Sequence, residues 1–544
     1  MREINLGVRE GEIVLLAGRS GSGKSSLIRV INGLIPFFYE GSFAGQIILS
    51  GEDITDFSPR NRLRKGIATV SQFPEDQILA RKVWRAVAFG LANLGFSREE
   101  IIKRVREALK FVDMWEYWDR ETLSLSAGQK QKVVLAAALA LQPKVLLLDE
   151  PTSQLDPLSA QKFLLSLSII RDELDVTIIV AEHRFDELTM IADKVVLIEN
   201  GEVIAEGPPK HIFASNIPKE IGIGYPKLAM LSRILFSDNE IVLSVSEFRK
   251  KLDEKKCKVF RTYSVPKVSD VLRNSSDAVV LEDVWFAYDK EWILKNVSFR
   301  IGEGAFVAIV GPNGAGKTTL LKLISGIHKP VKGRVLIYGK DSRKLKLNEL
   351  IGLVGYMPQN PEEIFFNDTV FDEIAFALRM QRVPLEKIKE RVLEIAKLLG
   401  ISHLLKESPF NISGGEKLRV ALASILVLDP KILLLDEPTR GIDWNTKYTF
   451  FSKIREVLSS KTIILATHDI ELLAELPIDK IVLVSEGEIV KEGDKRILAD
   501  SVIENHKLVR PKIAHLMDML GVRGVVSIEE AAKIIRCVEW SYQR

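Results

Sequence analysis

Short, uniformly apolar runs alternate with helical patterns along the chain. Runs of this kind lie at residues 13–17, 145–148, 176–181, 306–310, 432–435 and 462–467, and apolar residues with helical spacing are found at 130–141, 320–324 and 417–428. An uninterrupted run of four to six apolar residues is typical of a strand whose two faces are both covered by helices. The alternation therefore predicts an α/β fold.

The motifs around these runs occur twice, in the same order. Two glycine-rich loops, at 18–26 and 311–319, are 293 positions apart. The other pairs lie at offsets of 287 or 285 and comprise Gln72 and Gln359, the Ser-Ala-Gly run 126–128 and the Ser-Gly-Gly run 413–415, the Asp-Glu-Pro-Thr runs 149–152 and 436–439, and His183 and His468. A nearly constant offset over five elements indicates a duplicated nucleotide-binding domain.

Each glycine-rich loop lies between a predicted strand and a predicted helix, which is the context that a phosphate-binding loop requires. The glycines let backbone N–H groups close around phosphate oxygens, and the helix N-terminus adds partial positive charge. Lys24 and Lys317 would reach the β- and γ-phosphates, while the hydroxyl groups of Ser25 and Thr318 would bind Mg²⁺. For a single loop, a glycine-rich turn that binds nothing would be the alternative. The loop residues expected to bind nucleotide are Gly18, Ser20, Gly21, Ser22, Gly23, Lys24, Ser25 and Ser26, and Gly311, Asn313, Gly314, Ala315, Gly316, Lys317, Thr318 and Thr319.

An acidic pair ends one apolar run in each half. Asp149-Glu150 and Asp436-Glu437 stand at the carboxyl end of a predicted buried strand, where α/β sheets place their ligands. Alone, such a pair would be an ordinary strand end, but after a phosphate-binding loop it indicates catalysis. We expect Asp149 and Asp436 to hold Mg²⁺ through water, and Glu150 and Glu437 to polarise the attacking water.

A histidine follows the last predicted strand of each half, His183 in the first and His468 in the second. A single histidine there would more often be structural, and a single glutamine would be an unremarkable surface residue. Because both recur in both halves, we expect the histidines to contact the γ-phosphate and orient the water. We expect Gln72 and Gln359 to sense Mg²⁺ and the γ-phosphate.

Small residues precede a predicted helix in each half. These are Ser126, Ala127 and Gly128 in the first half, and Ser413, Gly414 and Gly415 in the second. A capping serine beside small residues offers a hydroxyl group and backbone N–H groups to an anion. Either run alone would be a plain helix cap.

Length and composition limit the remaining possibilities. A chain of 544 residues is too long for one hydrophobic core, and its net charge of +3 does not argue for a nucleic-acid partner. No stretch approaches 18 uninterrupted apolar residues and the N-terminus has no signal-peptide core, so we predict neither a membrane span nor export. Cys257 and Cys537 are far apart and have no metal-ligand spacing, so we expect a reducing cytoplasm.

The repeat sets the expected domains. We predict a first nucleotide-binding domain at 1–209, its helical appendage at 210–255, a linker at 256–276, a second domain at 277–496 and its appendage at 497–544. The first domain begins at a point that corresponds to about residue 294, without a counterpart of Tyr288 or of the opening edge strand. We expect either a start codon further upstream or a first site without an aromatic platform. The unpaired sheet edge favours the upstream start.

The order of phosphate loop, glutamine, Ser-Gly-Gly-type signature, Leu-Leu-Leu-Asp-Glu-Pro run and histidine resembles that of the ATP-binding-cassette (ABC) ATPases over nearly the whole chain. The resemblance implies two P-loop domains, each with a mixed β core, a helical signature subdomain and a small, mainly helical appendage. It implies ATP and Mg²⁺ as cofactors. It also implies head-to-tail closure, so that the loop at 18–26 shares its ATP with 413–415 and the loop at 311–319 shares its ATP with 126–128, while Tyr288 stacks on adenine.

Both halves keep the lysine, glutamate and histidine, so two hydrolytic sites are expected. Ala127 replaces the usual central glycine of the signature, and Glu416 replaces the commoner glutamine. The two rates need not be equal.

Within this family, residues 72–78, 87–91, 359–364 and 370–376 resemble the energising ATPases of energy-coupling-factor importers, as do the proline-centred appendages. Those importers take up vitamins or transition-metal ions. The resemblance implies a membrane coupling protein and a substrate-binding membrane protein as partners, a place on the cytoplasmic face of the cell membrane, and no nucleic acid. Asp372 and Glu373 would receive an arginine from the coupling protein. The first half has Arg85 and Ala86 at these positions. Its docking would then rely on Glu75 and Asp76, or it would differ altogether.

Two alternatives stay open. One is a soluble tandem ABC ATPase that acts on ribosomes or nucleic acid, although the sequence lacks the cysteine-rich cluster motif, the long charged arm and the zinc-finger insertions of such relatives. The other is the fused ATPase of a sugar importer, in which the second cassette usually degenerates. Here both copies are intact.

Overall fold

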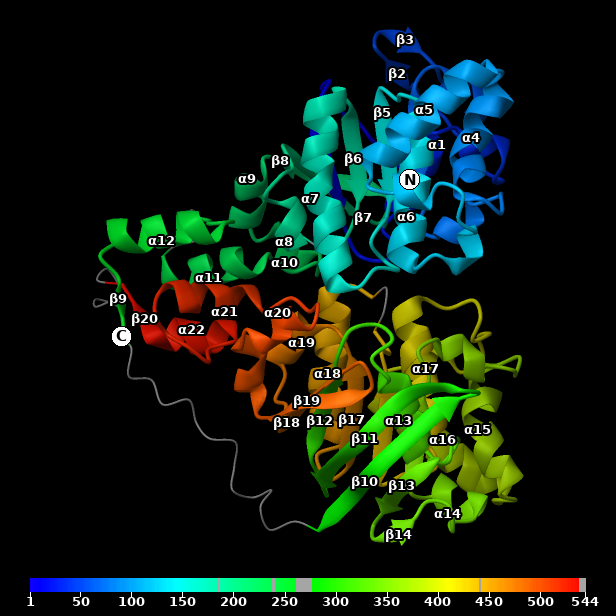
Figure 1. Ribbon diagram of the computed structural model, residues 1–544, viewed down its shortest axis with the longest axis vertical. Coiled ribbons are helices and arrows are strands. Elements are labelled where there is room, and N and C mark those ends of the chain that lie inside the picture. The colour runs from blue at the N-terminus through cyan, green and yellow to red at the C-terminus, as the bar shows by residue number, and fades with distance from the viewer. Residues whose placement is uncertain (184, 237–239, 261–275, 440–441, 538–544) are drawn as a thin grey trace. The chain divides into compact units, whose positions relative to one another are not determined.

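The computed structural model describes residues 1–183, 185–236, 240–260, 276–439 and 442–537. The chain forms two units, 1–254 and 255–544, which are described separately (Figure 1). The predicted linker therefore begins inside the second unit, because β9 (Lys258–Val259) pairs with β20 (Ile535–Arg536). The remainder of that predicted linker, 261–275, lies outside the described residues.

A disulfide bond beside this strand pair joins Cys257 to Cys537. The two cysteines are 280 positions apart, and their spacing in the sequence predicted no pairing. Antiparallel pairing of β9 and β20 brings them together. The expectation of a reducing cytoplasm rested on the wide spacing of the two cysteines in the sequence, which does not reveal that they lie side by side.

The central sheet has the same strand order in both units and confirms the predicted α/β fold. In each sheet the first five strands are parallel, and the last is antiparallel to its neighbour. In the first unit the order is β4 (Ile67–Val70), β5 (Val145–Asp149), β6 (Thr177–Ala181), β1 (Ile13–Ala17), β7 (Lys194–Glu199) and β8 (Glu202–Gly207). In the second it is β15 (Val354–Met357), β16 (Ile432–Asp436), β17 (Thr462–Thr467), β12 (Phe306–Val310), β18 (Lys480–Ser485) and β19 (Glu488–Gly493).

Both faces of each central strand are buried, which explains the uninterrupted apolar runs. Along β12, Phe306, Ala308 and Val310 belong to one hydrophobic core, while Val307 and Ile309 belong to another. Alternate side chains of a strand point to opposite faces, so a sheet covered on both sides needs apolar residues at every position.

A second, antiparallel sheet in the second unit has the order β11 (Glu291–Gly302), β10 (Asp277–Tyr288), β13 (Lys332–Ile337) and β14 (Lys340–Asp341). At the place of β13 and β14, the first unit has the short pair β2 (Ile48–Leu49) and β3 (Glu52–Asp53). The described residues of the first unit contain no strand equivalent to β10, as the repeat predicted, and none equivalent to β11, which the repeat did not predict.

Helices surround each sheet (Figure 1). The signature subdomains consist of α4 (Val83–Leu94), α5 (Arg98–Phe111) and α6 (Ala127–Ala140), and of α15 (Val370–Met380), α16 (Leu385–Leu398) and α17 (Gly414–Leu426). Further helices on the two units are α3 (Pro59–Arg64), α7 (Pro157–Leu174), α8 (Phe185–Leu188), α18 (Trp444–Val457) and α19 (Ile470–Glu475). No helix of the described residues is long and apolar enough to cross a membrane.

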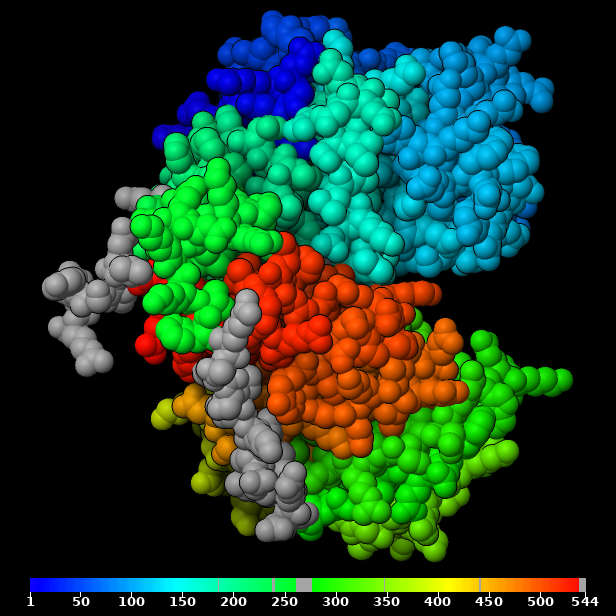
Figure 2. Space-filling model, turned by 60° about the vertical axis from the view of Figure 1, so that its left-hand side comes forward, coloured from blue at the N-terminus to red at the C-terminus, as the bar shows by residue number. Residues whose placement is uncertain are grey.

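Each unit ends in a mainly helical appendage. The first contains α9 (Pro209–Ala214), α10 (Ile217–Glu220), α11 (Lys227–Leu235) and α12 (Val245–Glu254), and the second contains η7 (Lys495–Ala499), α20 (Val502–Asn505), α21 (Lys512–Met519) and α22 (Ile528–Ile534). In Figure 2 the red surface of the second appendage lies against the orange surface of its own unit. Backbone N–H groups of Lys512 and Ile528 bond there to Glu471 and Glu475.

Candidate active sites

In each unit a glycine-rich loop connects a central strand to a helix. Strand β1 leads through residues 18–23 into α1 (Lys24–Ile31), and β12 leads through 311–316 into α13 (Lys317–Ile324). The residue before each helix, Gly23 or Gly316, has φ of 109° or 98°. This left-handed conformation is open to glycine at no steric cost, and it lets the loop curl around the helix N-terminus.

The loop lysines are buried and point into their own loops. Lys24 Nζ donates to the carbonyl oxygens of Gly18 and Arg19 at 2.8 and 2.9 Å. Lys317 Nζ donates to those of Gly311 and Pro312 at 2.8 and 3.0 Å. An ammonium group held inside such a loop is placed to meet phosphate oxygens.

The residues predicted to bind Mg²⁺ meet in both units. Ser25 Oγ donates to Asp149 Oδ1 at 2.7 Å, and Thr318 Oγ1 donates to Asp436 Oδ1 at 3.1 Å. Burial raises the pKa of both aspartates, because an ionised carboxylate loses solvation there. Hydroxyl and carboxylate oxygens are hard ligands of the kind that Mg²⁺ prefers, so these residues fit that ion.

Each predicted catalytic glutamate stands where its strand ends. Glu150 and Glu437 have φ of 45° and 44°, a left-handed conformation that is uncommon for residues other than glycine. Their backbone N–H groups still donate to the neighbouring strand, at the carbonyl oxygens of Ala181 and Ala466, at 2.9 Å. The last ladder bond therefore anchors the residue while its backbone turns away from the strand direction.

In the first unit the predicted glutamine, glutamate and histidine come together. His183 Nε2 lies 3.0 Å from Glu150 Oε1, and Gln72 Nε2 donates to Glu150 Oε2 at 3.1 Å. Burial opposes the ionisation of Glu150, but the hydrogen bond and charge of His183 outweigh it and, with the charge of Lys24, hold its pKa below the ordinary value.

The second unit has the same arrangement with one more cation in contact. His468 Nδ1 lies 2.9 Å and Lys317 Nζ 3.1 Å from Glu437 Oε1, while Gln359 Nε2 is 3.5 Å from Oε2. Burial again opposes ionisation, yet His468 and Lys317 together lower the pKa of Glu437 to about 2. An ionised carboxylate at this place can accept a hydrogen bond from an attacking water.

Comparisons with known proteins agree with this geometry. The family model described as ABC transporter matches residues 1–153 and 294–440. A provisionally named ABC transporter ATP-binding protein of Methanosarcina mazei is 35% identical over 534 residues, which cover 96% of this chain and 91% of that protein. The chain belongs to the ABC transporter family. It is an ATPase with two ABC domains, as the sequence predicted.

A further relative of this ABC ATPase has a similar extent, and a solved structure matches less than half of the chain. A provisionally named ABC transporter ATP-binding protein of Caldanaerobacter subterraneus subsp. tengcongensis is 34% identical over 546 residues, which cover 97% of this chain and 94% of that protein. A solved structure of cbiO1 from Clostridium perfringens, described as part of the ABC transporter complex cbiONQ, is 32% identical, covers 45% of this chain and all of its own, and has a TM-score of 0.39.

Tyr356 is a site residue of the second ABC domain that the sequence analysis missed. Its hydroxyl group donates to Asp436 Oδ2 at 3.1 Å, opposite the bond from Thr318, and burial raises the pKa of Tyr356. The position 287 residues earlier is Thr69, whose Oγ1 accepts from Asn32 Nδ2 at 3.2 Å. Because the two residues differ, the repeat carried no signal for this contact.

Tyr288 ends β10 at the tip of the β10–β11 hairpin and is partly exposed. Its hydroxyl group lies 2.8 Å from His328 Nε2, and Phe286 stacks on the same histidine with ring centroids 5.1 Å apart. The ring is thus fixed from the side while it keeps an exposed surface, as an aromatic base platform requires.

The signature serines cap their helices, which begin three residues earlier than the apolar pattern predicted. Ser126 forms a capping box with Gln129, and Ser413 forms one with Glu416. Glu416 stands where glutamine is commoner, and the Ser413 hydroxyl group donates to its carboxylate at 2.6 Å. The signature serine of the second domain is therefore bonded to an acidic side chain. The corresponding partner in the first ABC domain is a neutral amide.

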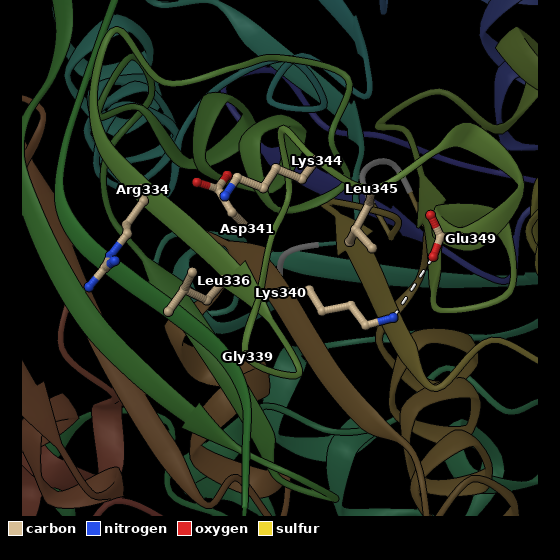
Figure 3. A pocket seen from close by; sticks show the side chains of 8 residues that line it. All are labelled: Arg334, Leu336, Gly339, Lys340, Asp341, Lys344, Leu345 and Glu349. Carbon is tan, nitrogen blue, oxygen red and sulfur yellow. Dashed lines mark ion pairs between the residues drawn. The ribbon is translucent and has the colours of Figure 1, made fainter.

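A shallow pocket of about 400 Å³ lies apart from these residues, on the antiparallel sheet of the second unit (Figure 3). It is lined by Arg334, Leu336, Gly339, Lys340, Asp341, Lys344, Leu345 and Glu349. None of them is a predicted site residue. Two of its charged residues pair with each other, Lys340 Nζ with Glu349 Oε1 at 3.8 Å.

Proposed function

We propose that the chain is the ATP-hydrolysing energy-coupling subunit of an importer of the energy-coupling-factor type. It would drive uptake of a vitamin or a transition-metal ion through a membrane coupling protein and a substrate-binding membrane protein, from the cytoplasmic face of the cell membrane. The observation that carries this proposal is that each unit combines the predicted catalytic side chains with an exposed apolar residue seven positions after its glutamine, Gln72 or Gln359.

The proposed catalytic roles follow the contacts within each unit. Lys24 and Lys317 bind the phosphates of ATP, and Ser25, Gln72 and Asp149, with their counterparts Thr318, Gln359 and Asp436, hold Mg²⁺. Glu150 and Glu437 polarise the attacking water, and His183 and His468 orient it toward the γ-phosphate. The signature runs 126–128 and 413–415 would each complete the site of the other unit, and Tyr288 would stack on adenine.

The exposed apolar residues are repeated in the two units. Phe366 is 58% exposed and packs edge-on against Phe376, with ring centroids 4.4 Å apart. The positions 287 residues earlier are Leu79 and Phe89, which are 65% and 45% exposed. Exposed apolar side chains at matching positions of a repeat favour a protein partner with apolar contact residues. Such a partner fits the cytoplasmic surface of a membrane coupling protein.

The position of Glu373 does not favour the arginine-binding role that the sequence predicted. Glu373 is buried, and its Oε2 accepts hydrogen bonds from the backbone N–H groups of Phe366 and Asn367, both at 2.9 Å. It holds the loop that presents Phe366. Asp372 is bonded to Arg379 at 2.6 Å, so an arginine of a partner would have to displace a residue of the chain itself.

The proposal is tested by purifying the tagged chain from its own cells in a mild detergent. We expect a multi-span membrane protein and a small substrate-binding membrane protein to co-purify in fixed ratio. Phe366→Asp should release them, while Val331→Asp, at a residue with 57% exposure whose backbone N–H bonds to Trp285 of β10, should not. Both variants should keep the ATPase rate of the isolated chain.

Recovery of ribosomes or nucleic acid without any membrane protein would overturn the importer and support the soluble tandem ATPase instead. The same holds if Phe366→Asp and Val331→Asp retain the membrane partners equally, because the exposed aromatic pair would then have no part in docking. ATP hydrolysis belongs to the family and would stand in either case.

A further inference from the structure

Glu182 is a buried carboxylate beside the first active site. It stands between β6 and His183 and is only 3% exposed. A carboxylate is rarely buried to this extent unless other groups satisfy its oxygens. None of the motifs of the sequence analysis included it.

Both oxygens of Glu182 have partners, and these belong to two different strand ends. Oε2 accepts from the hydroxyl group of Thr152 at 2.5 Å and from its backbone N–H at 3.3 Å. Oε1 accepts from the backbone N–H of His183 at 2.8 Å. Thr152 lies two residues after Glu150, so Glu182 connects the segment that carries the glutamate to the segment that carries the histidine.

This connection lies just where the strand pairing stops. The register of β5 and β6 ends at Asp149 and Ala181, and a final backbone bond joins Glu150 N–H to the carbonyl oxygen of Ala181. Beyond that point the two chains leave the ladder, while the 3.0 Å contact between Glu150 and His183 still depends on their separation. Beyond the ladder, the hydrogen bonds of the Glu182 side chain connect the two segments in place of backbone bonds.

The second unit differs at this position. Thr467 replaces Glu182, and its hydroxyl group accepts from the backbone N–H of Asp469, which follows His468. Asp469 in turn pairs with Lys447 on α18. Glu437 is contacted by both His468 and Lys317. The two active sites are therefore supported by different side chains.

We propose that Glu182 is a positioning residue of the first ATPase site. Through Thr152 and the backbone of His183 it sets the separation of Glu150 and His183, and so the orientation of the water that attacks the γ-phosphate. This inference rests on the catalytic roles given under the proposed function. The first site would therefore depend on the contact between Glu182 and Thr152. The second site lacks this contact, because Thr467 stands in place of Glu182.

The experiment uses the full chain with Glu437→Gln, which leaves turnover to the first site. Thr152→Val removes the hydroxyl donor with little change in shape, and Thr152→Ser keeps it. We expect Thr152→Val to lower kcat about tenfold while KM stays within about twofold, since misplacing a catalytic group acts on the chemical step. Thr152→Ser should restore kcat. Glu182→Gln, which can still accept from His183, should show a smaller loss than Glu182→Thr.

The matched control is Thr439→Val in a chain with Glu150→Gln, because Thr439 is the counterpart of Thr152 in the unit without the carboxylate. Its kcat should not change. An unchanged kcat in Thr152→Val, or equal losses in Thr152→Val and Thr152→Ser, would overturn the proposal, as would a fall in thermal midpoint without a fall in kcat. If turnover in the Glu437→Gln chain does not depend on Glu150, the first site itself fails, and the positioning role fails with it.

Discussion

The carboxylate of Glu471 accepts a hydrogen bond from the backbone N–H of Lys512 at 2.7 Å. Glu471 stands three residues after His468, and Lys512 is the first residue of α21 in the appendage. The relation recurs in the first unit, where Asp186, three residues after His183, accepts from the backbone N–H of Lys227 at 2.8 Å. In both units the first residue of an appendage helix therefore bonds to a carboxylate three positions after the predicted catalytic histidine.

Glu471→Ala should loosen the second appendage. A hydrogen bond from a helix N-terminus to a carboxylate contributes about 1.5–3 kcal/mol, so amide protection in α21 should fall about tenfold or more in hydrogen-exchange measurements. Glu488→Ala, at an exposed position on β19, serves as the control and should leave this protection unchanged. Equal protection in the two variants would contradict the predicted anchoring.

Removal of the catalytic carboxylates should stop hydrolysis but not binding. In steady-state assays, Glu150→Gln and Glu437→Gln should each abolish turnover at their own site, and the double variant should lose at least about a hundredfold of the activity while it still binds ATP. Equilibrium binding of a fluorescent ATP analogue checks the second part. A double variant with a normal rate would remove both glutamates from the mechanism.

The depressed pKa of Glu437 predicts a loss of stability in acid. Its folded-state pKa is about 2, against an ordinary value of 4.5, so the ionised form is favoured by folding. This contribution is fully present above about pH 4.5 and is lost as the pH falls toward 2. Thermal unfolding of the wild-type chain should therefore be more acid-sensitive over this range than that of Glu437→Gln. Parallel curves would contradict the ion pairs with His468 and Lys317.

Arg62→Leu should destabilise the first unit severely. The guanidinium group is buried and donates to the carbonyl oxygens of Thr55 and Phe57 and, at the end of the phosphate-binding helix, of Val30 and Ile31. Leucine would leave these acceptors without a donor, at about 1–3 kcal/mol for each that water cannot reach. Thermal unfolding should show a clearly lower midpoint. Arg60→Leu, at an exposed position of the same helix, should have little effect.

Reduction of the disulfide should lower the stability of the second unit. The bond closes a loop of 280 positions, and a loop of this length restricts the unfolded chain by about 5.6 kcal/mol in the chain-entropy model. A reductant should therefore lower the thermal midpoint of the wild-type chain but not that of a variant with both Cys257→Ser and Cys537→Ser. Free thiols in the protein isolated from its cells would show that the bond is not formed there.

The sequence alone determined the local architecture of this protein. Uninterrupted apolar runs indicated strands covered on both faces, and the glycine loops, the acidic pairs and the histidines stood at the ends of those strands. Parallel strands bring such ends to one edge, so Glu150 and His183 could be expected on the same edge, and Gln72 was assigned to the same phosphate before their distances were known. The offset of 285 to 293 positions extended each inference to the second half.

Only the tertiary structure decided which side chains face one another across elements that no motif connects. Tyr356 meets Asp436, Glu182 meets Thr152, and Cys257 meets Cys537, because strand pairing and register set these distances, and sequence separation does not report them. Burial was equally hidden in the sequence. Glu373 reads as an exposed acid on a helix, yet it is buried, since the loop at 366–367 folds over it and satisfies its carboxylate.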